Sequence, residues 1–458
     1  MSQTFDYIIV GGGSAGSVIA SRLSEDPDVN VCLLEAGGPD KGMLIHMPAG
    51  IVAMVPTRIH NWAYQTVPQP GLLGRKGYQP RGKTLGGSSS INAMLYVRGH
   101  RCDYDQWAAL GNTGWSYKDV LPYFRKSEHN ETYADEFHGQ GGPLNVAELR
   151  QPSSYSQRFL NAAVQCGVPL NPDYNGAEQS GAFMYQMTHK NGERCSVAKG
   201  YLTPHLSRPN LTVMTHALTR KVLLEGRRAT GVQVRVNNQE LKLSARREVI
   251  LSAGAFGSPQ ILQLSGIGPA DELRGLGLPV VLDQKNVGRN LENHPGVNLQ
   301  YAARREDTLV AELGLFGQAK LGLEWLLFRR GLGAANFFEA GAFLKTHGGA
   351  DYANVQFEFL PLARRVVNGK VTVFPGFQLW LDLSRPHSRG YVRLRSADPR
   401  QQPDIVFNHL QAEEDCRDMV RSVRLARDLF SQPAWDGIRG AEVNPTADAQ
   451  TDADILAW

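Results

Sequence analysis

A glycine-rich turn close to the amino terminus has residue types and a spacing suited to holding phosphate groups. Gly11, Gly13 and Gly16 form a G-x-G-x-x-G pattern. In this pattern the first glycine allows a tight turn, the second lets the backbone approach a pyrophosphate, and the third lets a helix pack close to a strand. Glu35 lies about 20 residues further on, where such sites bind a ribose hydroxyl. The pattern predicts a dinucleotide site and leaves NAD and FAD open; a glycine-rich turn without a ligand is the alternative.

The elements that must position this turn are a strand before it, a helix after it and a second strand. Residues 5–10 are a continuous apolar run of the kind that forms a buried parallel strand. Residues 17–23 carry an apolar stripe with helical spacing, and residues 29–35 are a second apolar run that ends in an acid. The helix would direct its free N–H groups and the positive end of its dipole at the phosphates.

A second glycine turn follows an excursion, residues 39–80, that is rich in proline and glycine. Gly86–Gly87 precedes three serines at 88–90, and Arg81 and Lys83 add positive charge nearby. Small residues let backbone N–H groups reach a ligand closely. From the residues alone, this stretch is either a second anion-binding turn or a capped helix.

Two longer stretches resemble sequence signatures of the glucose–methanol–choline (GMC) oxidoreductase family. Residues 82–105 resemble the first signature and residues 254–268 the second, in the family's order behind the amino-terminal turn. The resemblance extends through essentially the whole chain. It is closest to the branch of bacterial choline dehydrogenases and FAD-dependent primary-alcohol dehydrogenases.

The resemblance implies an α/β fold, α+β overall. A Rossmann-like FAD-binding domain would occupy residues 1–298, with excursions at 39–80 and 106–200. A second substrate domain, built on an antiparallel sheet with helices, would occupy residues 299–458 and be incomplete.

The resemblance also implies which residues contact FAD. The first turn would meet the diphosphate, Glu35 the adenosine ribose, and the second turn the flavin and its linker. Trp62 is either a flavin contact or part of a local core, and Val222 is either an adenine contact or a strand core residue. No histidine occurs at 88–92, where some family members attach FAD covalently, so we expect non-covalent FAD. The full expected set is Gly11, Gly13, Ser14, Ala15, Gly16, Glu35, Ala36, Trp62, Thr84, Gly87, Asn92, Ala93, Met94, Leu95, Val222 and Gly254.

Alternating apolar residues predict sheets in two later parts of the chain. Residues 211–253 contain period-two runs separated by turn residues, which predicts an antiparallel meander whose last strand rejoins the main sheet. Runs at 355–359, 377–383 and 391–395 predict a sheet that roofs the flavin. The resemblance makes Glu339, just before these runs, a candidate substrate-side carboxylate; a partly buried ion pair is the alternative.

Composition and charge disfavour several classes of function. The 458 residues carry a formal net charge of +4 without a Lys/Arg block, which disfavours nucleic acid as a partner. Five scattered cysteines without C-x-x-C spacing predict reduced thiols and no metal site. The chain shows neither a secretory signal nor a span of about 20 apolar residues, which predicts a cytoplasmic protein. The apolar helix expected at 315–330 is a core helix, a lid over the substrate entrance, or a peripheral contact with the inner face of the cell membrane.

The chemistry that the resemblance implies needs a base. Alcohol oxidation by a flavin requires a group that takes the hydroxyl proton while a hydride passes to flavin N5, and a neutral histidine suits this role. The resemblance puts that histidine in a His-Pro motif beyond Trp458. His294–Pro295 has the dipeptide in a different context, and we interpret it as structural. We therefore expect a C-terminally truncated chain that has no catalytic residue of its own and is inactive.

The expected activity of a full-length chain is the oxidation of a primary alcohol, choline-like or aliphatic, to its aldehyde. The electrons would pass to a quinone or another acceptor. Two alternatives are a non-catalytic flavin-binding protein and an alcohol oxidase of the same family that uses oxygen.

Overall fold

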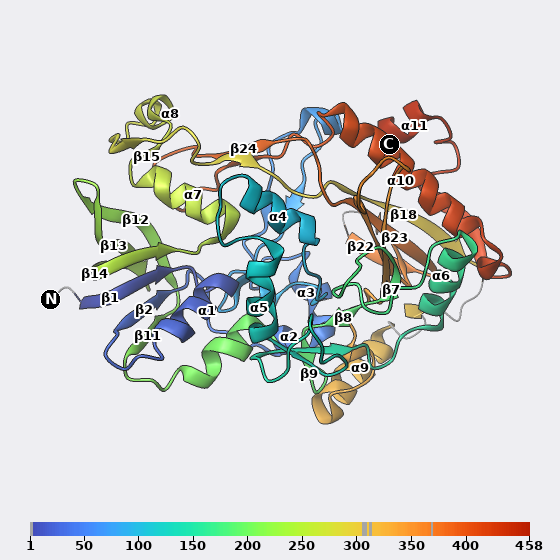
Figure 1. Ribbon diagram of the computed structural model, residues 1–458, viewed down its shortest axis with the longest axis horizontal. Helices are drawn as coiled ribbons and strands as arrows, with labels where there is room; N and C mark the ends of the chain where they lie inside the picture. Colours follow the sequence, from blue (N-terminus) through green and yellow to red (C-terminus); the bar gives the residue numbers. More distant parts are fainter. Residues whose placement is uncertain (1–2, 305–308, 311–313, 368–369) are drawn as a thin grey trace.

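The computed structural model describes residues 3–304, 309–310, 314–367 and 370–458. Within them, two six-stranded sheets lie toward opposite ends of the molecule, with helices and smaller sheets between and around them (Figure 1). The first sheet contains the amino-terminal strand, and the carboxyl-terminal helices lie beside the second.

The first sheet has the strand order β11-β2-β1-β14-β13-β12, and its first four strands run parallel. Ile8 and Ile9 point to opposite faces of β1 and are both fully buried, as expected for a parallel sheet covered on both sides. Ile9 packs with Ala20 of helix α1, and Ile8 packs with Ile261 of helix α7. The bounds are β1 (Gln3–Val10), β2 (Val31–Leu34), β11 (Leu211–Met214), β12 (Ala217–Glu225), β13 (Arg228–Val236), β14 (Gln239–Leu251), α1 (Ser14–Leu23) and α7 (Gly254–Leu264).

The predicted meander of residues 211–253 is confirmed for its last three strands and wrong for its first. β12, β13 and β14 pair antiparallel in sequence, and β14 then pairs parallel with β1. Residues 211–214 instead form β11, a parallel strand beside β2. This strand lies at the edge of the sheet and is only partly covered, so its sequence alternates like that of an antiparallel strand.

The second sheet has the order β26-β18-β23-β20-β19-β7, with every neighbouring pair antiparallel. One face is apolar: Leu379 and Leu381 of β23 pack with Phe159 of α6 and Val423 of α10. Figure 1 places α6 and α10 on the outer side of this sheet, away from the first sheet. The bounds are β7 (Gly181–Met184), β18 (Gly296–Ala303), β19 (Ala340–Leu344), β20 (Val355–Leu360), β23 (Gly376–Leu383), β26 (Arg439–Asn444), α6 (Ser154–Gln165) and α10 (Glu413–Ser431).

The other face of the second sheet carries polar side chains, because residues alternate between the two faces of a strand. Gln378, Trp380 and Asp382 of β23 share this inner face with Glu358 of β20 and Asn298 of β18. Since α6 and α10 cover the outer face, the inner face is the one turned toward the first sheet (Figure 1).

Two of the three runs predicted for the second sheet are confirmed as β20 and β23, and the third prediction is wrong. The run at 391–395 overlaps β24 (Gly390–Arg393), which pairs with β17 (Arg289–Leu291) and β25 (Asp404–Val406) in a separate sheet. The side chain of Gln263 on α7 holds β24 in this separate sheet. The Gln263 amide nitrogen donates to the Val392 carbonyl at 3.0 Å, and the Gln263 amide oxygen accepts from the Leu394 N–H at 3.1 Å.

The chain crosses between the two sheets more than once. β7 belongs to the excursion predicted at 106–200, yet it is the edge strand of the second sheet. The sheet of β17, β24 and β25 brings residues that follow the second sheet in sequence back beside α7. The predicted boundary between the FAD-binding domain and the substrate domain, at residue 298, falls inside β18. The division of the chain into these two domains stays a prediction.

Shorter elements connect and cover these sheets. No helix in the described part of the chain is long and apolar enough to cross a membrane. The remaining helices are α2 (Met43–His46), α3 (Ile51–Met54), α4 (Arg101–Ala109), α5 (Tyr117–Ser127), α8 (Ala270–Gly275), α9 (Leu315–Phe328) and α11 (Asp452–Ala457). The remaining strands are β3 (Tyr64–Gln65), β4 (Tyr78–Gln79), β5 (Glu128–Asn130), β6 (Leu144–Glu148), β8 (Gln186–Met187), β9 (His189–Lys190), β10 (Glu193–Arg194), β15 (Ile267–Gly268), β16 (Leu282–Asp283), β21 (Ala363–Val367) and β22 (Lys370–Phe374).

Candidate cofactor site

A cavity of about 850 Å³ lies at the carboxyl ends of the parallel strands. Val10, Leu34 and Leu251, the last residues of β1, β2 and β14, all line it. Open parallel sheets bind their ligands at this edge. The volume lies within the range of about 300–1,000 Å³ that is usual for ligand and cofactor pockets.

The first glycine turn forms one wall of the cavity. Gly13 is the residue before α1, and no side chain caps the first N–H groups of that helix, which leaves them for an anion. Gly11 has a φ of 102°, a conformation that favours glycine. A Cβ on Gly16 would overlap the carbonyl oxygen of Gly11, so only glycine lets α1 begin this close to β1.

Glu35 is fixed beside this turn by two backbone donors. Its carboxylate accepts from the N–H of Gly12 at 2.9 Å and from the N–H of Gly37 at 2.7 Å. Burial raises the pKa of Glu35 to about 7, although these hydrogen bonds and the charge of Lys83 oppose the rise. The carboxyl group therefore lies at the cavity wall in a fixed position, where it can accept a hydrogen bond from a sugar hydroxyl.

Three glycine turns meet behind the cavity. The Gly86 N–H donates to the carbonyl of Gly12 at 2.7 Å, and a Cβ on Gly87 would lie 2.7 Å from the Cα of Gly13. The hydroxyl of Ser252, just before the third turn at Gly254, donates to the Gly11 carbonyl at 2.9 Å. The turns thus leave one shared space in front of them for a long ligand.

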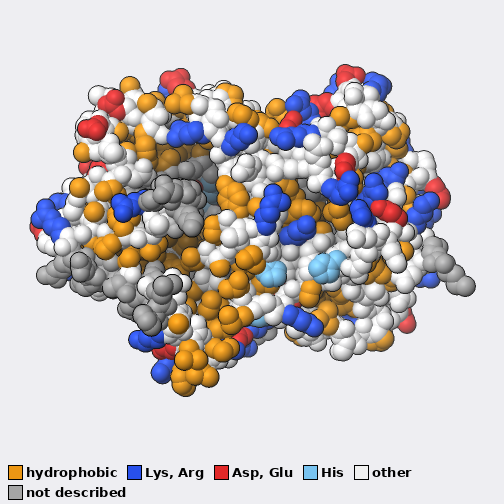
Figure 2. Space-filling model, turned by 180° about the vertical axis from the view of Figure 1, so that it is seen from behind, with side chains coloured by type: hydrophobic (Ala, Val, Ile, Leu, Met, Phe, Trp, Pro, Cys, Tyr) orange, Lys and Arg blue, Asp and Glu red, His pale blue; other side chains and the backbone are white. Residues whose placement is uncertain are grey.

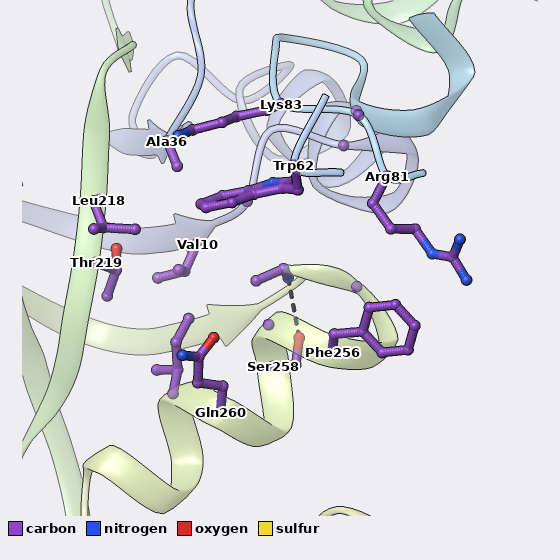
Figure 3. A pocket seen from close by; sticks show the side chains of 18 of the residues that line it. Val10, Ala36, Trp62, Arg81, Lys83, Leu218, Thr219, Phe256, Ser258 and Gln260 are labelled. Carbon is purple, nitrogen blue, oxygen red and sulfur yellow. Dashed lines mark hydrogen bonds between the residues drawn. The ribbon is translucent and has the colours of Figure 1, made fainter. Parts of the chain in front are cut away.

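Aromatic and cationic side chains enclose the rest of the cavity. Figure 3 shows the Trp62 ring on one side and the start of α7, with Phe256, on the other. The Lys83 ammonium lies 4.3 Å from the centre of the Trp62 ring, and the Arg81 guanidinium lies 4.7 Å from that of Phe256. Planar rings and positive charge suit a ligand that contains both an aromatic ring system and a diphosphate.

Family comparison agrees with this geometry. The model described as GMC oxidoreductase matches in two parts, the amino-terminal part over residues 5–296 and the carboxyl-terminal part over residues 386–457. The chain belongs to the GMC oxidoreductase family. Its cofactor is FAD, and the uncapped start of α1, the fixed Glu35 carboxylate and the ring-lined cavity all fit that molecule.

Relatives of this GMC protein include two oxygen-dependent choline dehydrogenases. The one from Brucella canis is 44% identical over 98% of this chain and 82% of its own length. The one from Photobacterium profundum is 43% identical over 100% of this chain and 81% of its own length.

Solved structures of the family have the same fold. The formate oxidase of Aspergillus oryzae has a TM-score of 0.90 at 26% identity, over 100% of this chain and 86% of the other. An FAD-dependent oxidoreductase from Chaetomium thermophilum has a TM-score of 0.88 at 27% identity, over 99% of this chain and 86% of the other.

The structure brings nine of the sixteen expected cofactor residues to the cavity wall. These are Gly11, Gly13, Ser14, Ala15, Glu35, Ala36, Trp62, Gly87 and Gly254. The other seven lie behind the wall or beyond it; they are Gly16, Thr84, Asn92, Ala93, Met94, Leu95 and Val222. Val222 is buried in the core of the first sheet, where its N–H donates to the Ser265 hydroxyl at 2.8 Å. Leu218 and Thr219, earlier on the same strand, reach the cavity instead (Figure 3).

Part of the cavity wall consists of residues that the sequence did not predict. Phe256, Ser258 and Gln260 belong to the second signature, which could have identified them (Figure 3). Residues 399–402 also line the cavity, although they follow the first turn by almost four hundred positions. No local pattern in the sequence marks this segment as part of a cofactor site.

Arg194 holds the stretch that follows the second glycine turn. This role of Arg194 was not predicted from the sequence either. It is fully buried, and its guanidinium donates to the carbonyl and side-chain oxygens of Asn92 at 2.8 and 2.9 Å and to the carbonyls of Ser89 and Ile45. Burial lowers the pKa of Arg194 to about 9. Its role is to fix the backbone of the turn, because all of these partners are amide oxygens.

Glu339, the expected substrate-side carboxylate, lies at a different cavity. It is 2% exposed and lines a cavity of about 450 Å³ between the start of α6 and α9. Its carboxylate accepts from the Ser153 N–H at 2.7 Å and from the Ser156 hydroxyl at 2.6 Å. Burial raises the pKa of Glu339, against these hydrogen bonds. In this position it caps the start of α6, and it has no ion-pair partner among the residues that the structure describes.

Asp135, His138 and Asp173 are close enough together for one metal ion. The His138 ring is nevertheless already bound, with Nδ1 3.1 Å from Glu128 and Nε2 3.0 Å from Asp173. Burial lowers the pKa of His138, but the hydrogen bonds to Asp173 and Glu128 outweigh this and raise it to about 9. A protonated histidine between two carboxylates accounts for this cluster.

Proposed function

We propose that this GMC protein oxidises a primary alcohol, choline-like or aliphatic, to the aldehyde and passes the electrons to a quinone or another acceptor. The observation that carries the proposal is the identity of 43–44% to oxygen-dependent choline dehydrogenases over nearly the whole chain. The cavity supports it, because its walls have the chemistry of an FAD site at the correct edge of the sheet.

Bound FAD supplies the acceptor for a hydride from the alcohol carbon. The chain itself would hold the diphosphate at the start of α1 and the ribose at Glu35. Holding the cofactor in place lowers the entropic part of the barrier. No histidine is among the described residues that line the cavity, so the proposal includes a proton acceptor outside this set.

The test is anaerobic reduction of the FAD-loaded protein by a panel of choline, a linear primary alcohol and a polyether alcohol, with a secondary alcohol as the control. We expect a primary alcohol to bleach the flavin absorbance and to yield one aldehyde per flavin. We expect this bleaching only when imidazole is added, because neutral imidazole can take the hydroxyl proton and no histidine lines the described part of the cavity.

Reduction of the flavin by dithionite distinguishes alcohol oxidation from flavin binding without alcohol chemistry. If dithionite bleaches the bound flavin and no alcohol does, with or without imidazole, alcohol oxidation is rejected. The protein is then a flavin-binding protein without alcohol chemistry.

Oxygen as the acceptor is a second candidate, supported by similarity to a formate oxidase and to choline dehydrogenases named as oxygen-dependent. Reoxidation of the dithionite-reduced protein distinguishes the acceptors. Faster recovery of the flavin absorbance with a soluble quinone than with air-saturated buffer supports a dehydrogenase, and the reverse order supports an oxidase.

Peripheral membrane contact is proposed at α9. Leu323, Leu326, Leu327 and Phe328 are between 52% and 61% exposed on this helix. Figure 2 shows a hydrophobic cluster at the lower edge of the molecule, where α9 lies in Figure 1. We expect the protein to sediment with anionic lipid vesicles and the Leu326→Glu, Leu327→Glu variant to stay in solution; equal sedimentation of both proteins would reject α9 as the contact.

A further inference from the structure

Helix α9 rests on the hairpin formed by β9 and β10. The Trp325 indole N–H donates at 2.8 Å to the carbonyl of Gly192, which lies in the turn of this hairpin. A Cβ on Gly192, whose φ is 75°, would lie 1.9 Å from the Arg329 carbonyl oxygen, so the turn touches the end of α9. Figure 1 shows α9 beside β9 at the lower edge of the molecule. The end of α9 therefore has a fixed place against the hairpin.

An ion pair joins the same two elements. The Arg329 Nε donates at 2.6 Å to the carboxylate of Glu193, the first residue of β10. The Arg329 guanidinium also donates to the Trp325 carbonyl at 2.8 Å and lies 4.2 Å from the centre of the Trp325 ring. Because Arg329 is bonded to both elements, a displacement of α9 disturbs the position of Glu193.

The residue after Glu193 connects the hairpin to the cofactor cavity. Arg194 is fully buried and donates to the carbonyl of Ser89 at 3.2 Å and to that of Asn92 at 2.8 Å. Ser88, directly before Ser89, lines the cavity. Side chains of neighbouring strand residues point to opposite faces, so Glu193 contacts α9 while Arg194 contacts the stretch after the second glycine turn. The hairpin thus lies between α9 and the cavity wall.

The outer side of α9 has little support from the described part of the chain. Leu323, Leu326, Leu327 and Phe328 are more than half exposed on this side. The helix has 14 residues, a length at which a helix is only marginally stable without packing. A lipid surface that buries these four side chains therefore stabilises α9, and with it the contacts that the end of the helix makes with the hairpin.

We propose that an anionic lipid surface bound at α9 strengthens FAD binding through the β9–β10 hairpin. This inference rests on the membrane contact proposed above for α9. A surface that holds α9 in place also holds the hairpin and the second glycine turn, so less conformational freedom remains to be lost when FAD binds. The coupling is reciprocal, because bound FAD must then strengthen lipid binding by the same factor.

The experiment titrates the protein with FAD, followed by flavin fluorescence, with and without vesicles made of phosphatidylglycerol and phosphatidylcholine in equal parts. We expect FAD to bind at least fivefold more tightly to vesicle-bound protein, because couplings between two sites are commonly about 5–150-fold. Sedimentation with vesicles should give the same factor when FAD-loaded and FAD-free proteins are compared. The Leu326→Glu, Leu327→Glu variant is the control, and vesicles should leave its FAD affinity unchanged.

Variants at the contact between α9 and β10 distinguish the hairpin from other routes. Glu193→Gln and Arg329→Gln should each still sediment with vesicles, but the vesicles should no longer change the affinity for FAD. Arg329→Lys keeps a cation for Glu193 and should keep the coupling. Glu324→Gln makes the same chemical change as Glu193→Gln but removes an ion pair with Arg330, away from the hairpin, and should also keep the coupling.

A measurement without lipid tests the hairpin independently of the membrane contact. In buffer without vesicles, Arg329→Gln should weaken FAD binding by about fivefold, the lower end of common couplings, and Arg329→Lys should bind FAD normally. Circular dichroism identifies variants that fail to fold. If the unaltered protein does not sediment with vesicles, the membrane contact is rejected, and this comparison alone decides whether α9 is coupled to the cavity.

Three results would overturn the inference. Unchanged FAD affinity of vesicle-bound protein would show that α9 is not coupled to the cavity. Coupling that persists in folded Glu193→Gln and Arg329→Gln proteins would place the route outside the hairpin. Equal FAD affinity of Arg329→Gln and Arg329→Lys without lipid would show that the ion pair does not support the second glycine turn. None of these measurements involves turnover, so a failure of alcohol oxidation rejects only the proposed activity.

Discussion

At the scale of single residues, ionisable side chains in this protein are fixed by the backbone groups and charges around them. Glu35 is held by two backbone donors, so it is already oriented for a sugar hydroxyl before FAD arrives. Arg194 is held by carbonyl and side-chain amide oxygens and fixes the stretch that follows the second glycine turn. His138 is held by two carboxylates and remains charged at neutral pH.

At a pH of about 8.5, above the pKa of about 7 of Glu35, Glu35→Gln should weaken FAD binding, because an amide cannot accept from both backbone donors and the ribose loses a charged acceptor. A hydrogen bond to a charged group contributes about 1.5–3 kcal/mol, which corresponds to a loss of about 10–100-fold in affinity. Titration followed by flavin fluorescence measures it. Glu25→Gln, in the exposed turn that follows α1, is the control and should bind FAD normally; equal affinity for both variants would contradict the role of Glu35.

His138→Gln should destabilise the fold in a way that depends on pH. The pKa of His138 is raised from 6.5 to about 9, so the protonated ring contributes its full stability below pH 6.5 and loses it as the pH rises through 9. Each pKa unit corresponds to about 1.4 kcal/mol, so the free energies of unfolding of the two proteins should differ by about 3 kcal/mol at pH 6, and this difference should shrink by pH 9. Urea unfolding across this range measures it, with the partly exposed His205→Gln as control. A difference that stays constant with pH would exclude a charged His138.

At the scale of elements, the cofactor site depends on how closely three turns approach each other. The second turn touches the first at Gly87 and Gly13, and the third is joined to the first through Ser252. Each turn starts or precedes a helix whose direction follows from the turn. A small change at their meeting point should therefore disturb both the packing and the ligand.

Gly87→Ala should lower the free energy of unfolding by about 1–3 kcal/mol and reduce FAD binding at least tenfold. Its Cβ would lie 2.7 Å from the Gly13 backbone, and its φ is 53°. Gly226→Ala is a matched control, because Gly226 has a φ of 60° but no atom within 4 Å of the added Cβ. Thermal unfolding and FAD titration of both variants separate steric overlap from backbone strain. Similar losses in the two proteins would mean that the contact between the turns is unimportant.

At the scale of the whole molecule, residues from distant parts of the chain close one cavity. Residues 11–15 form one wall and residues 399–402 another. A ligand that fills the space between them stabilises the folded state by mass action, by about 2.7 kcal/mol at a ligand concentration of 100 Kd.

Hydrogen exchange should detect this coupling. Adding FAD should slow amide exchange at 11–16 and at 399–402 together, because the same ligand contacts both walls. Residues 348–351, a largely exposed turn that does not line the cavity, serve as the internal control. Protection of the first turn without protection of 399–402 would contradict a shared cavity.

Local patterns were sufficient to predict the parts of the fold whose neighbours are close in sequence. The strand, turn and helix around Gly11 could be predicted because each has its own periodicity and glycine positions. The pairing direction of β11 could not, because an edge strand alternates in the same way whichever partner it has. Residues 399–402 and Arg194 could not be assigned either, since their contacts depend on the folded path of the whole chain.

The position of residues 399–402 in the cavity wall has a consequence for how the protein is made. During synthesis the amino-terminal end of a chain emerges and folds first. The glycine turns can form early, but the cavity gains its last wall only after the ribosome has passed residue 402. FAD is therefore captured only after residue 402 has been synthesised, and the nascent chain must keep its open pocket soluble until then.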